Sequence, residues 1–165
     1  MMRYDKNSTF KKNDDYFTPK YAWENIKEYI PQDTVIWEAF YHPISKSADF
    51  LRELGFNVIS ENIDFFENNL GETIVTNPPY SKTKEILTRL VNEIDKPFIL
   101  ILPCAKITTK YFKQVFKGKE HLIKIIIPSK RISFIDKEGN QTSRASFDTY
   151  YYCYKINLPN TITWL

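Results

Sequence analysis

Hydrophobic residues follow two different spacings along this chain, and segments with one spacing alternate with segments that have the other. Short apolar runs rich in Ile, Val, Phe and Tyr, bounded by polar or turn-forming residues, predict β-strands. Such runs cover residues 35–40, 58–60, 73–76, 98–102, 122–127 and 149–156. Between several of them, apolar residues recur every three or four positions, which predicts amphipathic helices. These helices cover residues 19–30, 47–54, 82–94 and 111–116.

The alternation of strands and helices predicts an α/β protein with a mainly parallel sheet and helices on both faces. Residues 98–102 are almost continuously apolar, as expected of a strand buried on both faces. The segment from Arg131 to Phe147 contains a turn-forming sequence at Asp136–Asn140. We therefore expect an antiparallel hairpin at one edge of the sheet.

The first 15 residues are polar and show neither spacing. We expect them to form a polar N-terminal arm, followed by a single domain over residues 16–165. A length of 165 residues suits one domain, and a hydrophobic content of 42% is sufficient for a buried core. No internal repeat or low-complexity tract interrupts the pattern.

Composition excludes several classes of protein. The two cysteines, Cys104 and Cys153, lie in apolar, strand-like surroundings and form neither a disulfide framework nor a zinc set, so we expect no metal. The longest apolar run, Phe98–Leu102, is far shorter than the about 20 residues that span a bilayer. The polar start of the chain does not resemble a secretory signal. These features favour an intracellular, reducing compartment without membrane attachment.

Charge is divided unevenly along the chain. Residues 1–76 hold 8 Lys and Arg against 13 Asp and Glu, a net charge of −5, whereas residues 77–165 hold 15 against 7, a net charge of +8. Any one lysine can simply solvate the surface, but the group favours a nucleic-acid partner. The candidate nucleic-acid-binding residues are Lys82, Lys84, Lys106, Lys110, Lys130, Arg131 and Arg144.

The tetrapeptide Asn77-Pro78-Pro79-Tyr80 directly follows the predicted strand 73–76. Asn-Pro is an ordinary turn dipeptide, so a tight turn is the simplest interpretation. However, a sequence of this kind is rare at average composition. Ligands of open α/β sheets bind beyond the carboxyl ends of the strands, where this tetrapeptide is expected to lie. Its position and its rarity together favour a functional site.

The tetrapeptide has the groups needed to activate an exocyclic amine, whose lone pair is delocalised into its ring. The Asn77 side-chain oxygen and the Pro78 carbonyl can accept the two N–H hydrogens and favour the developing positive charge. Pro78 and Pro79 restrict the backbone that presents this carbonyl. Tyr80 offers a flat face on which a heterocycle can stack, worth roughly 1–3 kcal/mol for a base.

With this motif the chain resembles the S-adenosylmethionine-dependent DNA adenine-N6 methyltransferases, in particular the compact type of phages and large viruses. The resemblance begins near Asp14 and implies a Rossmann-like methyltransferase fold, with Asn77, Pro78, Pro79 and Tyr80 as the catalytic motif. It also implies a site for the cofactor S-adenosylmethionine. The residues assigned to that site by the resemblance are Phe17, Thr18, Pro19, Glu38, Phe40, Glu61, Asp64 and Phe65.

The chain departs from this family at one loop. A Gly-x-Gly sequence usually follows the first strand, but His42 and Ile44 stand at those positions here, with Pro43 between them. The side chains of His42 and Ile44 remove the conformational freedom and close approach that glycine allows. Either the loop follows another path and the cofactor still binds, or the protein binds nucleic acid or a partner without catalysis.

The identity of the substrate stays open at this stage. DNA is the first expectation, and single-stranded DNA is an alternative because the chain has no surplus length for a separate recognition region. RNA is another alternative, because RNA adenine methyltransferases carry the same tetrapeptide. Protein-glutamine methyltransferases carry the same tetrapeptide, although the basic second half argues against a protein substrate. A partner subunit or a homodimer is a further alternative. The expected location is cytoplasmic, or nuclear or viral for a viral protein.

Overall fold

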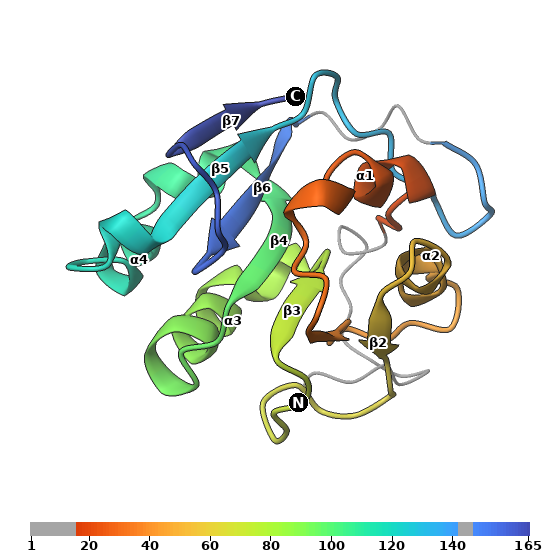
Figure 1. The fold of residues 1–165 in the computed structure, drawn as a ribbon, viewed down its shortest axis with the longest axis horizontal. Coiled ribbons are helices and arrows are strands. Elements are labelled where there is room, and N and C mark those ends of the chain that lie inside the picture. The colour runs from red at the N-terminus through yellow and green to blue at the C-terminus, as the bar shows by residue number, and fades with distance from the viewer. Residues whose placement is uncertain (1–15, 142–146) are drawn as a thin grey trace.

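A computed structural model describes residues 16–141 and 147–165 of the chain. These residues form an α/β fold around one seven-stranded sheet (Figure 1). The strands are β1 (Val35–Trp37), β2 (Asn57–Ile59), β3 (Thr73–Thr76), β4 (Phe98–Pro103), β5 (Ile123–Ile127), β6 (Thr149–Tyr154) and β7 (Ile162–Trp164). Their order across the sheet is β2-β1-β3-β4-β6-β5-β7.

Parallel pairing dominates the sheet. The pairs β1–β2, β1–β3, β3–β4 and β5–β7 are parallel, and β6 runs antiparallel to both β4 and β5. The carboxyl ends of β1, β3, β4 and β5 therefore lie along one edge of the sheet, and β6 begins at that same edge. This arrangement confirms the predicted mainly parallel α/β class.

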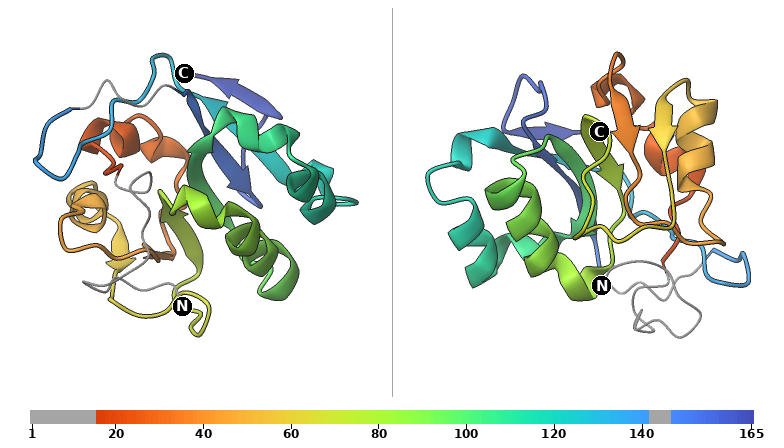
Figure 2. Two further views of the ribbon diagram at one scale, coloured as in Figure 1. Left: turned by 180° about the vertical axis from the view of Figure 1, so that it is seen from behind. Right: turned by 90° about the horizontal axis from the view of Figure 1, so that it is seen from below.

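The helices divide between the two faces of the sheet, as predicted (Figure 2). The α-helices are α1 (Lys20–Glu24), α2 (Ser47–Glu53), α3 (Thr83–Thr88) and α4 (Lys110–Val115). Shorter 3₁₀ turns occupy Lys27–Tyr29, Tyr80–Lys82, Cys104–Thr108 and Glu120–Leu122, and a π-helical turn, Arg89–Glu93, extends α3. In the right panel of Figure 2, α1 and α2 lie on the opposite side of the strands from α3 and α4.

The period of two along the strands creates two separate hydrophobic cores. Phe98, Leu100 and Leu102 of β4 enter the core beneath α3 and α4, and Ile99 and Ile101 enter the core beneath α1 and α2. All five side chains have no exposed surface. At about 1.5–3 kcal/mol for each fully buried large apolar side chain, this central strand stabilises both layers at once.

The structure corrects two expectations about the sheet. The antiparallel strand β6 does not lie at an edge but between β4 and β5. The edge is formed instead by β7, which was not predicted and pairs in parallel with β5. Ile162 and Trp164 are exposed, so β7 has neither the length nor the buried face that a sequence pattern detects.

Helix lengths also differ from the prediction. The helix expected over 19–30 is α1 followed by a separate 3₁₀ turn, because Ile26 leaves the helical conformation at φ −115° and ψ 10°. The turn predicted at Asp136–Asn140 is present. Its backbone closes from Asp136 to Asn140, and Ile135 bridges to both Gln141 and Phe17. The predicted arm, residues 1–15, lies outside the described residues.

The chain enters β3 through a loop held by Lys96. The Lys96 ammonium donates to the carbonyls of Leu70 at 2.7 Å and Gly71 at 3.0 Å and to Asn69 Oδ1, and it lies 5.4 Å from the Trp37 ring centroid. Burial lowers the pKa of Lys96. This contact places the loop against β1 immediately before the strand that leads to Asn77.

Gly71 is the point at which this loop tolerates no side chain. Its φ is +61°, and a Cβ there would lie 2.9 Å from the Val35 carbonyl oxygen and 3.1 Å from Trp37 Cβ. Gly118 has a similar φ of +78° but open space around it. We expect Gly118→Ala to cost about 1–2 kcal/mol of unfolding free energy through the left-handed conformation alone. Gly71→Ala should cost about 1–3 kcal/mol more, because the loop must also move.

Urea denaturation of the two variants measures this difference. Equal losses of unfolding free energy in Gly71→Ala and Gly118→Ala would show that the loop against Trp37 is not closely packed.

Candidate active site

Asn77 leaves the central region of the sheet at the end of β3, between the ends of β1 and β4. Pro78 and Pro79 carry the chain away from the strand, and Tyr80 begins the 3₁₀ turn that leads into α3. Both prolines are buried and Asn77 is partly buried. The tetrapeptide thus lies at the carboxyl edge of the sheet, as its position in the sequence predicts.

The Asn77 amide is held in one orientation. Its Nδ2 donates a hydrogen bond of 2.9 Å to the Tyr16 carbonyl oxygen. Its Oδ1 is buried and has no hydrogen-bond partner among the described residues. The Pro78 carbonyl accepts no hydrogen bond from the backbone N–H of any described residue. Buried acceptors are nearly always paired, so the unpaired Asn77 oxygen indicates a place for a donor supplied by a ligand.

Four aromatic rings surround this corner. Tyr16 stacks on Tyr80 with ring centroids 6.4 Å apart and an interplanar angle of 23°. Phe147 meets both rings edge-on, at 5.6 Å from Tyr16 and 5.8 Å from Tyr80, and Phe134 lies 5.9 Å from Tyr16. The sequence analysis identified Tyr80 but missed the other three. They come from the segments before α1 and after β5, which only the fold brings together.

Glu38 directly follows β1, the strand that pairs with β3. Its Oε1 accepts hydrogen bonds from Thr76 Oγ1 and from the Phe40 backbone N–H, the latter at 3.4 Å. The residue is only 3% exposed. Burial raises the pKa of Glu38, and the bond from Thr76 partly opposes this shift. A cation placed beside the carboxylate would lower the pKa again.

The cavity beside Glu38 holds about 90 Å³ and is closed by the loop that lacks glycine. His42 shapes this loop: its Nδ1 accepts from the Ile44 N–H at 3.1 Å, and its carbonyl accepts from the Ser45 N–H at 3.1 Å. The His42 ring also packs against Phe17, with centroids 4.8 Å apart. The two replacements for glycine therefore build a compact turn, with His42 facing inward and Ile44 44% exposed.

A second cavity of about 330 Å³ lies on the outer side of the same loop. Phe17, Thr18 and Ile44 line it together with the turn after Ile135. Thr18 is 3% exposed, and its Oγ1 has no partner among the described residues. Pro19, the third residue of the predicted segment, is buried at the start of α1.

The other residues assigned to the cofactor line neither of these two cavities. Phe40 and Phe65 belong to the core, where Phe65 has no exposed surface and packs on Phe40 at 4.8 Å. Asp64 Oδ1 accepts from the Phe66 N–H at 2.9 Å, and Glu61 is exposed. Phe65 thus offers no free face to a ligand in this conformation.

S-adenosylmethionine can be tested against these residues. A carboxylate buried at the end of β1, beside an unpaired amide oxygen at the end of β3, suits a ligand with a cationic end. The cavity of about 90 Å³ is smaller than the about 300 Å³ at which small-molecule sites begin. It therefore fits one polar end of such a ligand, held by Glu38, and not the whole molecule.

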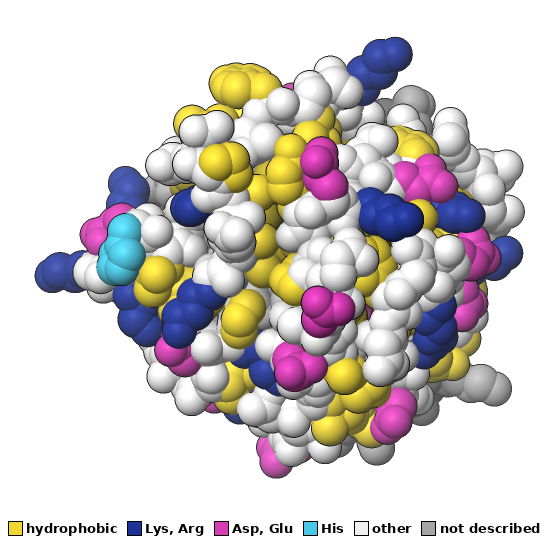
Figure 3. Space-filling view, in the orientation of Figure 1, with side chains coloured by type: hydrophobic (Ala, Val, Ile, Leu, Met, Phe, Trp, Pro, Cys, Tyr) yellow, Lys and Arg dark blue, Asp and Glu magenta, His cyan; other side chains and the backbone are white. Residues whose placement is uncertain are grey.

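Five candidate basic residues follow the carboxyl ends of three parallel strands. Lys82 and Lys84 come after β3, Lys106 and Lys110 after β4, and Lys130 after β5. None of the five forms an ion pair within residues 16–141 and 147–165. Lys106 Nζ reaches the Tyr80 carbonyl at 3.4 Å. Arg131 pairs with Asp148, and Arg144 lies outside the described residues. In Figure 3, Lys and Arg side chains gather around α4.

No helix within residues 16–141 and 147–165 is both long and apolar enough to cross a membrane. Nor do three or more His, Cys, Asp or Glu side chains in this part of the chain cluster as metal ligands would.

Comparison with known proteins gives only distant similarity. No protein-family model matches the chain, and no curated protein matches it. A solved structure similar to it is that of a Listeria monocytogenes protein assigned as a class I S-adenosylmethionine-dependent methyltransferase. The identity is 12%, the TM-score is 0.47, and the match covers 93% of this chain but only 66% of the other. The function must therefore be argued from the site itself.

The buried carboxylate predicts a pH dependence of stability. Because the pKa of Glu38 is raised in the fold, the folded protein holds this proton more tightly than the unfolded chain. The contribution of Glu38 to stability is thus fully present below about pH 4.3, the unfolded value, and falls as the pH rises through the folded pKa. Glu38→Gln stays neutral, so its unfolding free energy should lack this fall.

Urea denaturation of both proteins between about pH 4 and pH 8 isolates this contribution. The unfolding free energy of the wild type should decline relative to that of Glu38→Gln as the pH rises. Parallel profiles would show that the carboxylate is solvated rather than buried.

Proposed function

We propose that this protein transfers a methyl group from S-adenosylmethionine to the exocyclic N6 amine of adenine in DNA. The observation that carries the proposal is the Asn77 amide, whose nitrogen donates to the Tyr16 carbonyl and whose buried oxygen has no partner among the described residues. An unpaired buried oxygen costs roughly 1–3 kcal/mol of stability, and such a cost is expected where a ligand supplies the missing donor.

Recognition of the amine uses two oxygens. Asn77 Oδ1 and the Pro78 carbonyl oxygen each accept one N–H hydrogen of the adenine amine, so both oxygens contact the nitrogen that is methylated. As the N–C bond forms, the nitrogen becomes positively charged, and these oxygens stabilise that charge more strongly than the neutral amine. Because the Tyr16 carbonyl holds Nδ2, the amide cannot rotate to present its own N–H groups to the substrate.

The aromatic cluster supports a flat heterocycle as the guest. Tyr80 follows the two prolines, and its ring centroid lies 6.4 Å from that of Tyr16 and 5.8 Å from that of Phe147. An adenine turned out of its stack can exchange base-stacking contacts for contacts with these rings. An aliphatic amide, such as that of glutamine, would gain much less from such a cluster.

The donor belongs on the side of β1. When bound, S-adenosylmethionine would supply a methyl group on a sulfonium. The amine nitrogen would form the N–C bond as the C–S bond breaks, the neutral thioether S-adenosylhomocysteine would leave, and the methylated nitrogen would lose its extra proton to water, so that neither a metal nor a covalent enzyme intermediate is required. Glu38 would hold a cationic part of this molecule, and Thr76 orients the carboxylate through its hydrogen bond. The chain's task is then to place the amine in line with the methyl group and to exclude water.

The lysines after β3, β4 and β5, which form no ion pair with the described residues, support a polyanionic substrate along the same edge of the sheet. Phosphate contacts give affinity and position a nucleic acid without reading its sequence. The edge of the sheet would thus hold the strand while the corner at Asn77 receives the base.

The sharpest test replaces the proposed amine acceptor. Asn77→Ala removes Oδ1 and should lower methyl transfer to an adenine-containing oligonucleotide by about 10²–10³-fold, as for loss of one preorganised polar group at a developing charge. Its unfolding free energy should stay within about 1 kcal/mol of the wild type, because the lost bond to Tyr16 is offset by removal of an unpaired oxygen.

A matched control is Asn68→Ala, which loses a similar bond, 2.8 Å from Asn68 Nδ2 to the Asp64 carbonyl, away from this corner. It should keep full activity. The wild type should incorporate radiolabelled methyl groups into the oligonucleotide. Unchanged incorporation by Asn77→Ala, or no incorporation by the wild type, would overturn the proposal.

The basic edge makes a separate prediction about binding. The affinity for single-stranded DNA, measured by fluorescence anisotropy, should fall linearly with salt on logarithmic axes. Lys82→Ala and Lys106→Ala should each reduce the slope by about 0.7, the value for one lost phosphate contact. Lys27→Ala, an exposed lysine before β1, should leave the slope unchanged. Equal effects of all three changes would place the DNA elsewhere.

A further inference from the structure

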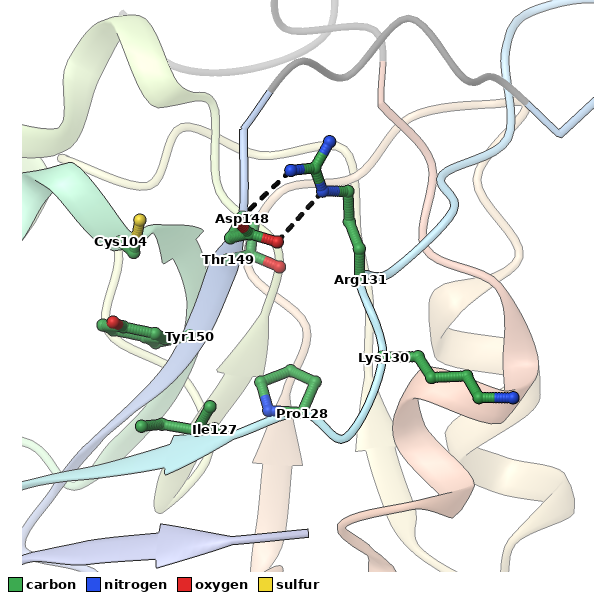
Figure 4. Close-up of a pocket in the computed structure, with 8 residues that line it drawn as sticks. All are labelled: Cys104, Ile127, Pro128, Lys130, Arg131, Asp148, Thr149 and Tyr150. Carbon is green, nitrogen blue, oxygen red and sulfur yellow. Dashed lines mark hydrogen bonds and ion pairs between the residues drawn. The ribbon is translucent and has the colours of Figure 1, made fainter.

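A third cavity lies two strands away from Asn77 along the same edge of the sheet. It holds about 240 Å³ and is formed where β4 ends, β5 ends and β6 begins (Figure 4). Neighbouring strands are about 4.8 Å apart, so β6 lies about 10 Å from β3. Phe147, which touches Tyr80, comes directly before Asp148 in the wall of this cavity. The cavity therefore adjoins the aromatic cluster at the proposed target site.

The cavity contains a buried hydroxyl without a partner. Thr149 is 4% exposed, and its Oγ1 makes no hydrogen bond to any described residue. Such a buried hydroxyl, on a residue that lines a cavity, is satisfied when a ligand with a polar edge reaches it. The rest of this part of the lining is apolar and consists of Ile127, Pro128 and the Tyr150 ring. The site thus offers apolar surface and one fixed hydrogen-bonding group.

The net charge of this cavity is close to neutral. Arg131 makes a two-point contact with Asp148, with Nε at 2.9 Å from Oδ1 and Nη2 at 3.2 Å from Oδ2. The Arg131 guanidinium lowers the pKa of Asp148, so the pair stays ionised and its charges cancel. Lys130 also lines the cavity, and in Figure 4 its ammonium is directed away from the other residues drawn. The ion pair itself offers no net charge to a phosphate, and a neutral guest is favoured.

The volume limits the size of the guest. About 240 Å³ is below the range of about 300–1,000 Å³ for whole small-molecule sites, yet sufficient for one flat heterocycle. A nucleobase is neutral and flat, and its edge carries both donors and acceptors. Unstacked bases of single strands are recognised in this way, by apolar contact and by hydrogen bonds to their edges.

We propose that this cavity binds an unpaired nucleobase of the strand that carries the target adenine, with the Thr149 hydroxyl as its hydrogen-bonding partner. The proposal rests on the nucleic-acid substrate proposed above. Occupation of the cavity would fix the register of the strand, so that the adenine a few nucleotides away reaches Asn77. It would also give the protein a preference at one flanking position without a separate recognition domain.

Cys104 reports directly on occupation of the cavity. Cys104 is partly exposed and lines the cavity, whereas Cys153 is buried, and burial raises the pKa of the Cys153 thiol. A small alkylating reagent such as iodoacetamide should therefore label Cys104 and leave Cys153 as an internal control. A base in the cavity should shield Cys104 from the reagent.

The experiment uses single-stranded oligonucleotides with one adenine, in which each flanking position in turn lacks its base. The complete oligonucleotide should slow the labelling of Cys104 by at least about threefold at saturation. One abasic position should restore the free labelling rate while anisotropy shows that the oligonucleotide is still bound. Slowing by every bound oligonucleotide alike, or by none, would overturn the proposal.

A pair of variants tests the hydroxyl itself. Thr149→Val keeps the shape of the side chain and should weaken binding of the complete oligonucleotide by about three- to tenfold, the effect of one lost hydrogen bond. The abasic oligonucleotide should bind both proteins equally. Thr163→Val removes another buried, unpartnered hydroxyl, in β7 and outside the cavity, and should bind like the wild type. Equal binding by Thr149→Val and the wild type would also overturn the assignment.

Methyl transfer measured on the same oligonucleotides separates the two proposals. Base-dependent protection of Cys104 without methyl transfer would support the cavity assignment and overturn the proposed activity. Methyl transfer without base-dependent protection would support the activity and overturn the cavity assignment. A failure of every oligonucleotide to bind would overturn both.

Discussion

The hydrogen bond from Asn77 Nδ2 to the Tyr16 carbonyl is the contact on which the site depends. An asparagine side chain can present either an acceptor or two donors, and only the accepting orientation can bind an amine through its hydrogens. The bond to Tyr16 decides between the two orientations and leaves Oδ1 buried and free. The two residues are 61 positions apart, so the complete fold is needed to set this one amide.

The sheet explains why so many other groups meet near this amide. Six of its seven strands point the same way, so the residues after β1, β3, β4 and β5 share one edge. Glu38 comes after the first of these strands, Asn77 after the second, and Cys104 after the third. The antiparallel β6 starts at this edge and adds Thr149. A buried carboxylate, a free amide oxygen and a neutral cavity are thereby arranged along one line.

Features encoded in local patterns were predictable from the sequence. The apolar run of β4 correctly predicted a strand buried on both faces, and the Asn-Pro-Pro-Tyr sequence correctly marked the end of a strand. Strand order was not predictable in the same way, because the insertion of β6 between β4 and β5 depends on contacts between distant segments. β7 was not predicted because Ile162 and Trp164 are exposed, so its sequence lacks the pattern of a strand with a buried face.

The predicted cofactor residues likewise divide into those that local sequence identifies and those whose environment depends on the fold. Glu38 could be anticipated as an acidic residue at a strand end, whereas the burial of Phe65 depends on its packing against Phe40 and Trp37. The consequence of replacing two loop glycines was also not evident from the sequence. In the structure His42 accepts a hydrogen bond within its own loop and covers Phe17, so the loop becomes a compact turn. The partners of Tyr80 were missed because single aromatic residues in irregular segments carry no periodic signal.

The most direct measurement compares oligonucleotides that differ only in the hydrogens on the reacting nitrogen. Affinities for adenine, for purine without the amine, and for N6,N6-dimethyladenine at the same position can be measured by calorimetry. Two acceptors at Asn77 and Pro78 predict that adenine binds at least about tenfold more tightly than the other two, since each loses both N–H donors. Equal affinity for the three bases would contradict the account, because the two oxygens would then not bind an amine.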